Sequence, residues 1–276
     1  DLNDFFNKKV NTKISTEKIT FNKNKFKNDT FNFYPAEDGK IIDKIEKFKN
    51  FYLKNDDISN GIHPHHAKVN KSHIEKSKIS AKVNEGIFVL NSSEIDNIKL
   101  NKNEREILKP LYYSKNLKKF YSNYKTDEFI IYTSSKFNDK KIIEKFPNIK
   151  SHLDKFKKII TSDFKPYGLH RKRNEKFFKG NKIASLRKCA EPKFTFTNYD
   201  CYLLADHYSI KTDRIDLKYL TLYLNSNVIK FWLKKKGKMQ GNNYQIDAEP
   251  LLKVPIYYPK NIKDYLLIFD EIKKDY

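Results

Sequence analysis

The longest apolar runs of this chain, Tyr265–Phe269 and Cys201–Ala205, are only five residues long. A helix that spans a membrane needs about 20 consecutive apolar residues, so the sequence predicts no membrane partner. The 18 Tyr and 21 Phe residues still supply enough large side chains for a hydrophobic core. The 276 residues therefore favour one large or two modest domains built from short strands and amphipathic helices, and they argue against wholesale disorder.

Strands and helices are both expected, in no regular alternation. Apolar alternation predicts strands, and apolar spacings of three or four residues predict helices. The expected strands are 19–21, 31–33, 85–90, 129–133 and 182–186, with a hairpin formed by 194–196 and 202–210. The expected helices begin near Lys40, Asn103, Pro147, Leu217 and Ser226, and the last one covers 262–272. We expect an α+β fold, with a small mixed twisted sheet, flanking helices and a helical C-terminal part.

Breaks between these elements follow from glycine, proline and polar residues. Pro110 is expected to stop the helix that begins at Asn103. Gly237 is expected to end the helix after Ser226 in a left-handed conformation. The polar stretch 55–80 is expected to form an extended connection.

Positive charge is concentrated in two parts of a chain whose formal net charge is +22. Residues 165–190 hold nine basic residues against Glu175 alone, including three of the five arginines. Residues 230–238 hold five lysines and no acid. Such clusters suit a polyanion, and nucleic acid is the commonest one in the cytoplasm. The alternative is an AT-rich coding sequence, which enriches Lys, Asn and Ile without any selection for binding.

The cysteine content and the N-terminal residue each support one further expectation. Cys189 and Cys201 are too few for a disulfide framework, so we expect reduced thiols and a cytoplasmic location. The chain begins with Asp1, and its single methionine is Met239. We therefore expect it to be part of a longer protein that carries any catalytic centre.

No catalytic residue is predicted. The seven glycines are scattered, so no phosphate-binding or dinucleotide-binding loop is present, and no GxSxG or HExxH pattern occurs. Four short acid-x-Lys sets, which begin at Asp38, Asp163, Glu191 and Glu271, fit a metal-dependent nuclease, but chance explains them in a chain that is 33% charged.

No metal site is predicted either. His63, His65 and His66 lie in a polar stretch with no cysteine nearby, and two adjacent histidines rarely point at one ion. We expect this stretch to form a surface or phosphate-facing loop.

Two segments are candidates for DNA contact. Segment 167–188 combines basic residues with aromatic ones, and segment 234–244 places glycines and amides after a lysine run. Arginine forks and side-chain amides read base edges, lysines neutralise phosphates, and glycine permits close backbone approach. The predicted DNA-binding residues are His170, Arg171, Arg173, Arg187, Lys188, Lys234, Lys235, Lys236, Lys238, Gln240, Asn242 and Asn243.

The order of several segments adds a resemblance. NGIHPHHAKVNKSHI, NEGIFVLNSSEI, NEREILKPLYYSKNLKKFY, FPNIKSHLDKFKKII, PYGLHRKR, NKIASLRK and YLTLYLNSNVIKFWLKKKGK, followed by VPI, occur between about Gly61 and Ile256. This series resembles the C-terminal TaqI-like specificity domain of adenine-N6 DNA methyltransferases, as found in type IIG restriction-modification enzymes. The family's (D/N/S)PP(Y/F) loop does not occur in this sequence.

The resemblance implies a division of labour within a longer protein. Residues 61–259 would be the target-recognition domain, 260–276 a C-terminal helix, and 1–60 a segment that connects to a catalytic domain. The implied partners are double-stranded DNA and the methyltransferase domain of the same protein. The parent would use S-adenosylmethionine, and magnesium if it also cuts DNA, whereas this part would hold no cofactor. The parent would then be an adenine-specific DNA methyltransferase of a bacterial defence system.

Three other functions remain consistent with the sequence. A type I recognition subunit usually has two recognition regions separated by long helices, and one region without a long heptad pattern is seen here. A free-standing metal-dependent nuclease would cleave DNA as this chain alone. An RNA-binding or structural protein would owe its charge to codon usage.

Overall fold

A computed structural model describes residues 35–122 and 124–275. The chain divides into two compact units, Asp1–Lys49 and Asn50–Tyr276. In the first unit, helix α2 (Ala36–Phe48) confirms the helix predicted near Lys40. The predicted strands at 19–21 and 31–33 lie outside the described residues.

The second unit contains three separate sheets rather than the single sheet expected from the sequence. The five-stranded sheet has the order β1 (Ile58–Asn60), β10 (His207–Ile210), β6 (Lys182–Leu186), β8 (Phe194–Thr197), β4 (Phe120–Tyr121). The four-stranded sheet has the order β2 (Val89–Asn91), β5 (Glu128–Ile131), β3 (Leu108–Tyr112), β9 (Tyr202–Leu203). The three-stranded sheet has the order β11 (Lys238–Gln240), β12 (Asn243–Gln245), β7 (Lys188–Cys189).

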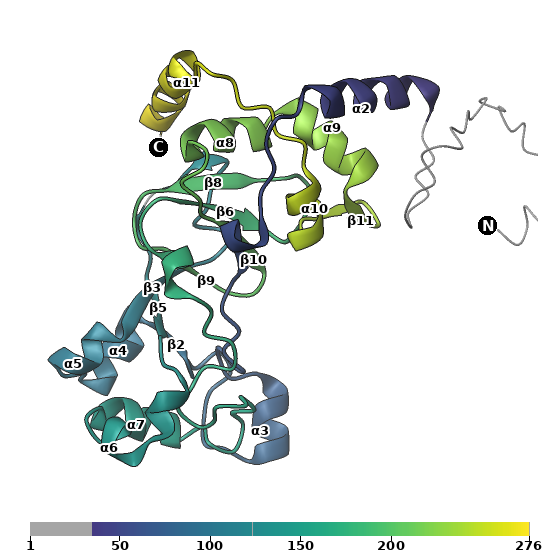
Figure 1. Ribbon diagram of the computed structural model, residues 1–276. Coiled ribbons are helices and arrows are strands. Elements are labelled where there is room, and N and C mark those ends of the chain that lie inside the picture. The colour runs from purple at the N-terminus through teal and green to yellow at the C-terminus, as the bar shows by residue number, and fades with distance from the viewer. Residues whose placement is uncertain (1–34, 123, 276) are drawn as a thin grey trace, which may run out of the picture. The chain divides into compact units, whose positions relative to one another are not determined.

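The helices fall into two groups (Figure 1). Around the four-stranded sheet lie α3 (Lys71–Ser77), α4 (Ser92–Ile98), α5 (Lys102–Glu106), α6 (Lys140–Ile143) and α7 (Pro147–Asp154). Near the other sheets lie α8 (Leu217–Leu224), α9 (Asn227–Lys236), α10 (Ala248–Lys253) and α11 (Lys263–Lys274). The described residues also contain the single 3-10 turns η2 (Asn55–Asp57), η3 (Ser135–Asn138) and η4 (Glu175–Phe178). The mixture confirms the α+β class, and no helix in the described ranges is long and apolar enough to cross a membrane.

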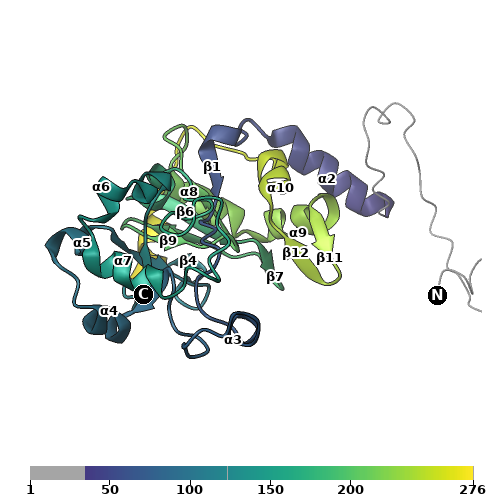
Figure 2. The ribbon, with the colours of Figure 1, turned by 90° about the horizontal axis from the view of Figure 1, so that it is seen from below.

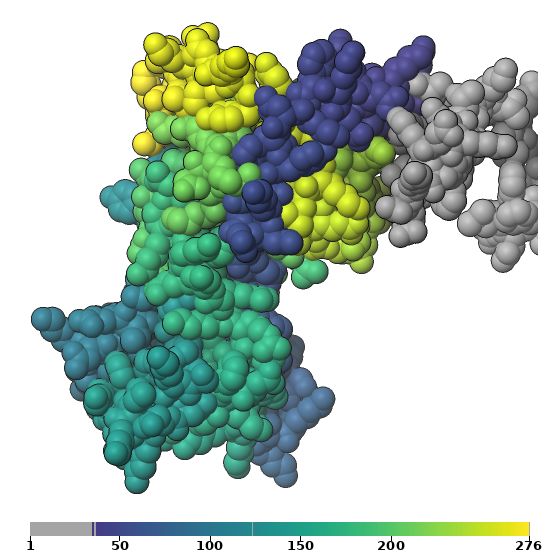
Figure 3. Space-filling model, in the orientation of Figure 1, coloured from purple at the N-terminus to yellow at the C-terminus, as the bar shows by residue number. Residues whose placement is uncertain are grey.

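One hydrophobic core fills the part of the unit that holds α3 to α7, and it includes β2, β3 and β5. The blue-to-teal segments of this part form one packed body in the space-filling view (Figure 3). Aromatic rings tie it to the η4 turn, because the ring of Phe178 stacks on Tyr202 at 5.3 Å between centroids. The fully buried Phe178 therefore belongs to the core, while the basic residues just before it remain at the surface.

Local sequence signals place most helices correctly. Pro147 opens α7, and the Ser226 side chain caps α9 by accepting a hydrogen bond from the backbone N–H of Ile229. The predicted C-terminal helix is α11, which packs its buried Phe269 edge-to-face on Phe196 of β8 at 5.5 Å between centroids.

The predicted hairpin is wrong. β8 pairs with β6 and β4, whereas β9 pairs in parallel with β3 of another sheet. The chain between β8 and β9 therefore crosses from one sheet to another. The turn residues Asn198–Asp200 resemble those of a hairpin, but strand pairing depends on distant partners that turn chemistry does not specify.

Three smaller predictions also need correction. Pro110 does not stop a helix; it lies inside β3, three residues beyond the helix C-cap Ile107. Gly237 ends α9 with φ −77°, not in a left-handed conformation. Glycine is required at this position for a steric reason, since a Cβ there would come within 2.4 Å of the Leu233 carbonyl oxygen. The stretch 55–80 is not simply extended, because it contains η2, β1 and α3.

Lys182 is a fully buried lysine in β6. Its ammonium group donates to the carbonyl oxygens of Gly180 at 2.8 Å and Tyr199 at 2.6 Å. Burial disfavours the charged form and lowers the pKa of Lys182 to about 8.

We expect Lys182→Met to change how stability depends on pH. Between pH 8 and about 10.4 the unfolded state binds a proton at residue 182 that the folded state has lost, so the wild type gains stability as pH rises. Relative to the variant, its free energy of unfolding should increase by about 1–2 kcal/mol between pH 7 and 9.5. Urea unfolding at both pH values measures this, and equal differences at the two values would contradict it.

Candidate nucleic-acid interface

The three-stranded sheet gathers residues from two distant parts of the sequence. β11 and β12 form a hairpin joined by Gly241 and Asn242, and β7 pairs with the outer side of β12. Gly241 has φ +58°, which a two-residue hairpin turn requires at its first position. Both segments predicted to contact DNA thus contribute strands to one small sheet, which lies beside α9 and α10 (Figure 2).

The register of this sheet puts polar side chains on one face. Lys188 pairs with Gln245, Gln245 with Lys238, and Asn243 with Gln240; paired residues in an antiparallel sheet share a face. The other face carries Cys189, Met239 and Tyr244. We call the polar face the amide–lysine face, and its members are Lys188, Lys238, Gln240, Asn243 and Gln245.

Arg187 lies just before β7 and is held by a carboxylate. Its Nε donates to Asp247 Oδ1 at 2.5 Å, and Gln245 Nε2 and Lys238 Nζ also reach Asp247, at 2.5 and 3.8 Å. The hydrogen bond that Arg187 donates to the Asp247 carboxylate raises the pKa of Arg187. Within the described residues, the two terminal nitrogens of Arg187 have no protein partner. Asp247 therefore fixes the direction of the guanidinium and leaves its fork available.

The lysine run at the end of α9 precedes this sheet directly. Lys234 is exposed, and Lys235 and Lys236 are half-buried. The ammonium group of Lys235 lies 5.9 Å from the centre of the Phe231 ring. At a helix C-terminus these charges also interact favourably with the helix dipole.

The remaining predicted residues form a second group around an isolated β-bridge between His63 and Arg171. Each of these two residues donates its backbone N–H to the other's carbonyl oxygen, at 3.1 and 3.0 Å. Arg171 Nη1 pairs with Asp163 Oδ2 at 3.1 Å, and His170 Nδ1 lies 3.2 Å from the same oxygen. Arg173 donates from Nε to the Gly61 carbonyl at 3.3 Å and from Nη2 to Asn60 Oδ1 at 3.4 Å.

Three imidazoles near this bridge, those of His63, His66 and His170, are biased toward the neutral form. Desolvation, followed by the charge of His65, lowers the pKa of both His63 and His170. Desolvation and then His73 lower the pKa of His66. Arg171 and Arg173 supply permanent positive charge beside these imidazoles.

Strand β10 connects the two groups. Its Tyr208 pairs with Asn60 of β1 on one side and with Ser185 of β6 on the other. Arg173 bonds to Asn60, and Arg187 donates its backbone N–H to the Asp206 carbonyl oxygen at 2.8 Å. Tyr208 is within electrostatic reach of both guanidinium groups. The structure thus arranges two groups of predicted residues on either side of one strand.

Sequence reasoning missed several residues of these two groups. Gln245 and Asp247 were not among the predicted ones, although reading Gly241–Asn242 as a hairpin turn would have put Gln245 opposite Lys238. Asn60 and Tyr208 had no local signal, because their roles depend on the pairing of β1 with β10.

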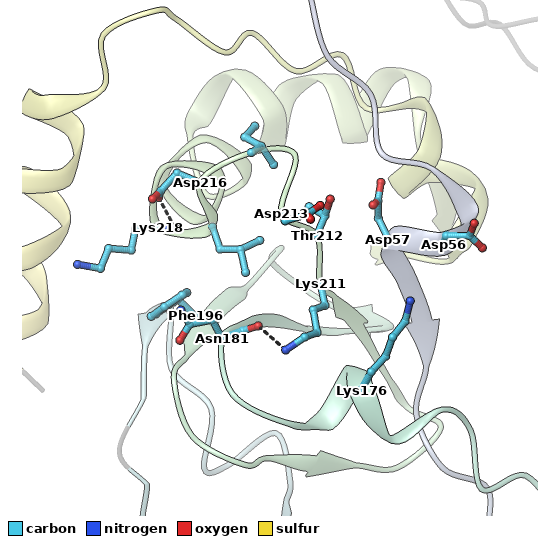
Figure 4. Close-up of a pocket in the computed structure, with 12 residues that line it drawn as sticks. Asp56, Asp57, Lys176, Asn181, Phe196, Lys211, Thr212, Asp213, Asp216 and Lys218 are labelled. Atoms are coloured by element: carbon cyan, nitrogen blue, oxygen red, sulfur yellow. Dashed lines mark hydrogen bonds between the residues drawn. The ribbon is translucent and has the colours of Figure 1, made fainter.

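Two cavities among the described residues have different linings. The first, of about 670 Å³, lies between η2 and the start of α8 (Figure 4). Its Asp57 is bonded to Arg214, Asp216 caps α8, and Lys211 donates to the carbonyls of Lys179 and Asn181. In the second, Glu94 accepts from two backbone N–H groups. Asp57, Asp216, Lys211 and Glu94 thus already serve the fold.

The acids of the short nuclease-like sets also have partners. Asp163 pairs with Arg171, Glu191 with Lys230 at 2.6 Å, and Glu271 with Lys274 at 2.7 Å. Among the described residues, the one group of three or more potential metal ligands is His63, His65 and His170.

Sequence comparison finds relatives among DNA-modifying enzymes. The type II methyltransferase M.HindII of Haemophilus influenzae is 25% identical over 178 residues, which are 56% of this chain and 33% of that protein. The type II methyltransferase M.HincII, also of H. influenzae, is 25% identical over 137 residues, 43% of this chain and 27% of its own length. The chain thus spans about a third of the length of these relatives. No protein-family profile matches it.

Structure comparison leads to the same group of enzymes. The type IIL restriction-modification enzyme MmeI, solved in complex with DNA, aligns with a TM-score of 0.51 and 12% identity over 83% of this chain and 29% of that enzyme. The type IIG restriction endonuclease BpuSI aligns with a TM-score of 0.51 and 12% identity, over 87% and 28%. The chain therefore has a fold found in part of these restriction-modification enzymes, and its sequence is similar to part of type II methyltransferases.

Proposed function

We propose that this chain recognises a target sequence in double-stranded DNA on behalf of a restriction-modification methyltransferase. The observation that carries the proposal is the amide–lysine face. Two amide-bearing strands and two lysines share one face of a small sheet, with Arg187 held by Asp247 at its end. A two-stranded ribbon fits the major groove, and amides and arginine forks pair with adenine and guanine edges there.

We propose different roles for the arginines and amides and for the lysines. Arg187, Gln240, Asn242 and Asn243 are proposed to read base edges, as are Arg171 and Arg173 in the second group. Lys234, Lys235, Lys236, Lys238 and Lys188 are proposed to neutralise phosphates, which releases counterions and makes binding salt-dependent. His170 would position Asp163 and Arg171 at the edge of this surface.

Our proposal for the methylated base and the cofactor follows the resemblance to TaqI-like specificity domains. We propose that the methyltransferase acts on adenine N6 and that the rest of the longer protein binds S-adenosylmethionine and receives the flipped base. Asp57 and Glu94, which line the two cavities described above, already bond to the protein itself, and we propose that the cofactor binds outside this chain. It would position DNA, and the methyl transfer would take place elsewhere.

Selection from a randomised duplex pool tests the proposal. The purified chain is incubated with the pool near physiological salt and excess nonspecific competitor, and the retained DNA is sequenced. We expect one short recovered motif, with affinity that falls steeply as salt rises. Retention without any motif would reduce the function to electrostatic binding. Preferential retention of an RNA pool in a parallel competition would contradict the proposal.

A further inference from the structure

Three histidines from distant parts of the chain meet at the His63–Arg171 bridge. One ring nitrogen from each of His63, His65 and His170 lies within 4.8 Å of the other two. The rings of His65 and His170 stack at 4.0 Å between centroids, and the His63 ring stands edge-on to His65 at 4.5 Å. His66 points to a different neighbour, with its ring 4.3 Å from that of His73.

The backbone holds this arrangement from both sides. The two hydrogen bonds between His63 and Arg171 fix the loop that carries His63 and His65 against the segment that carries His170. Pro64, between the first two histidines, is buried. The position of the three imidazoles therefore follows from the fold rather than from chance contact of side chains.

Polar partners orient two of the three rings. His65 Nδ1 lies 3.2 Å from Thr161 Oγ1 and 3.3 Å from its carbonyl oxygen. His170 Nδ1 lies 3.2 Å from Asp163 Oδ2. Metal-binding histidines commonly use one ring nitrogen for such a carbonyl or carboxylate and bind the ion with the other. In both residues Nε2 is then the atom left for a ligand.

We propose that His63, His65 and His170 form a binding site for a divalent transition metal ion of the zinc class. Zn–N bonds are about 2.0–2.1 Å, so the nitrogens of a tetrahedral site lie about 3.4 Å apart. To bind one ion, the exposed His63 and the stacked rings of His65 and His170 would rotate, so that the three nitrogens reach that spacing and point at the ion. The fourth position is open to water.

Nearby charges act in both directions on such an ion. Arg171 and Arg173 repel it, and the Asp163 carboxylate, which contacts both Arg171 and His170, offsets part of that repulsion. The bound ion would join residues 63–65 to residues 163–173 and so fix the segment that carries both arginines. The proposal of a metal site is independent of which nucleic acid the chain binds.

Metal titration of the full chain, without a histidine tag and after treatment with a chelator, tests this site. Zn²⁺ is titrated in competition with a chromogenic chelator. We expect one ion per chain with a Kd at or below about 1 µM. His63→Gln and His170→Gln should each weaken binding more than about 100-fold, and Asp163→Asn by about 10- to 100-fold. Zn²⁺ should also raise the Tm of the wild type but not that of His63→Gln.

His73→Gln is the matched control, because it removes a nearby imidazole outside the trio and glutamine preserves the cap at the start of α3. It should bind zinc like the wild type. His63 is exposed and bonds to Arg171 through its backbone, so its variant should stay folded. The site is excluded if the wild type binds no stoichiometric zinc, if His63→Gln binds like the wild type, or if His73→Gln loses as much affinity as the trio variants.

Discussion

Arg187→Ala is expected to relax the DNA sequence preference of this chain by about 1–3 kcal/mol at one base pair, up to roughly 100-fold in relative affinity. The expectation rests on how the side chain is held. Asp247 binds Nε and is itself only 14% exposed, so the guanidinium is oriented before DNA arrives. Its two terminal nitrogens have no partner among the described residues, and they match the paired acceptors O6 and N7 of guanine.

The matched control is Lys234→Ala, which removes one exposed positive charge from the end of α9. A lysine that contacts phosphate carries no sequence information, so this variant should weaken all duplexes about equally and reduce the salt dependence by about one counterion. Competition binding with the selected duplex and single-base variants of it, at two salt concentrations, separates the two behaviours. A uniform loss for Arg187→Ala would reassign Arg187 to the phosphate backbone.

The helices were largely predictable because their signals are local. Pro147, the Ser226 cap and the apolar spacing of 262–272 each act within a few residues of the helix they define. Strand pairing was not predictable in the same way. β8 and β9 look like neighbours in sequence, yet their partners are β6, β4 and β3, which lie from about 10 to 90 residues away.

In the candidate interface too, residue types could be predicted from the sequence, whereas strand pairing could not. Charge and amide content drew attention to Lys188, Lys238, Gln240 and Asn243 of β7, β11 and β12, but not to Gln245 or to its pairing with Lys188. The sequence argument against a metal site considered only His63, His65 and His66. It had no access to His170, about 100 residues further on, which the His63–Arg171 bridge brings to the same place.

Glu104→Ala is expected to destabilise the fold by about 2–4 kcal/mol. Glu104 is fully buried at the start of α5, where its Oε2 accepts from the Asn101 backbone at 2.9 Å. The same carboxylate reaches the start of α7 and accepts from the backbone N–H groups of Asn148 at 2.6 Å and Ile149 at 3.0 Å. The residue before α7, Phe146, offers no side-chain cap. Removing Glu104 therefore leaves several donors unsatisfied at two helix starts.

Charge and hydrogen bonding can be separated with Glu104→Gln, which keeps one acceptor oxygen and should lose only part of this stability. Burial alone would raise the pKa of Glu104, but the hydrogen bonds from Asn101, Asn148 and Ile149 outweigh it and lower the pKa. The folded state then binds its proton less readily than the unfolded state. The stabilisation is complete above about pH 4.3 and decreases as pH falls through the lowered pKa.

The wild type should therefore lose part of its advantage over Glu104→Gln when urea unfolding is repeated under increasingly acidic conditions. Glu106→Ala, at an exposed acid on the same helix, should change stability by no more than about 0.5 kcal/mol. If Glu106→Ala costs as much as Glu104→Ala, the effect comes from the intrinsic stability of α5. If Glu104→Ala alone is costly, the effect comes from the single carboxylate that joins the start of α5 to the start of α7.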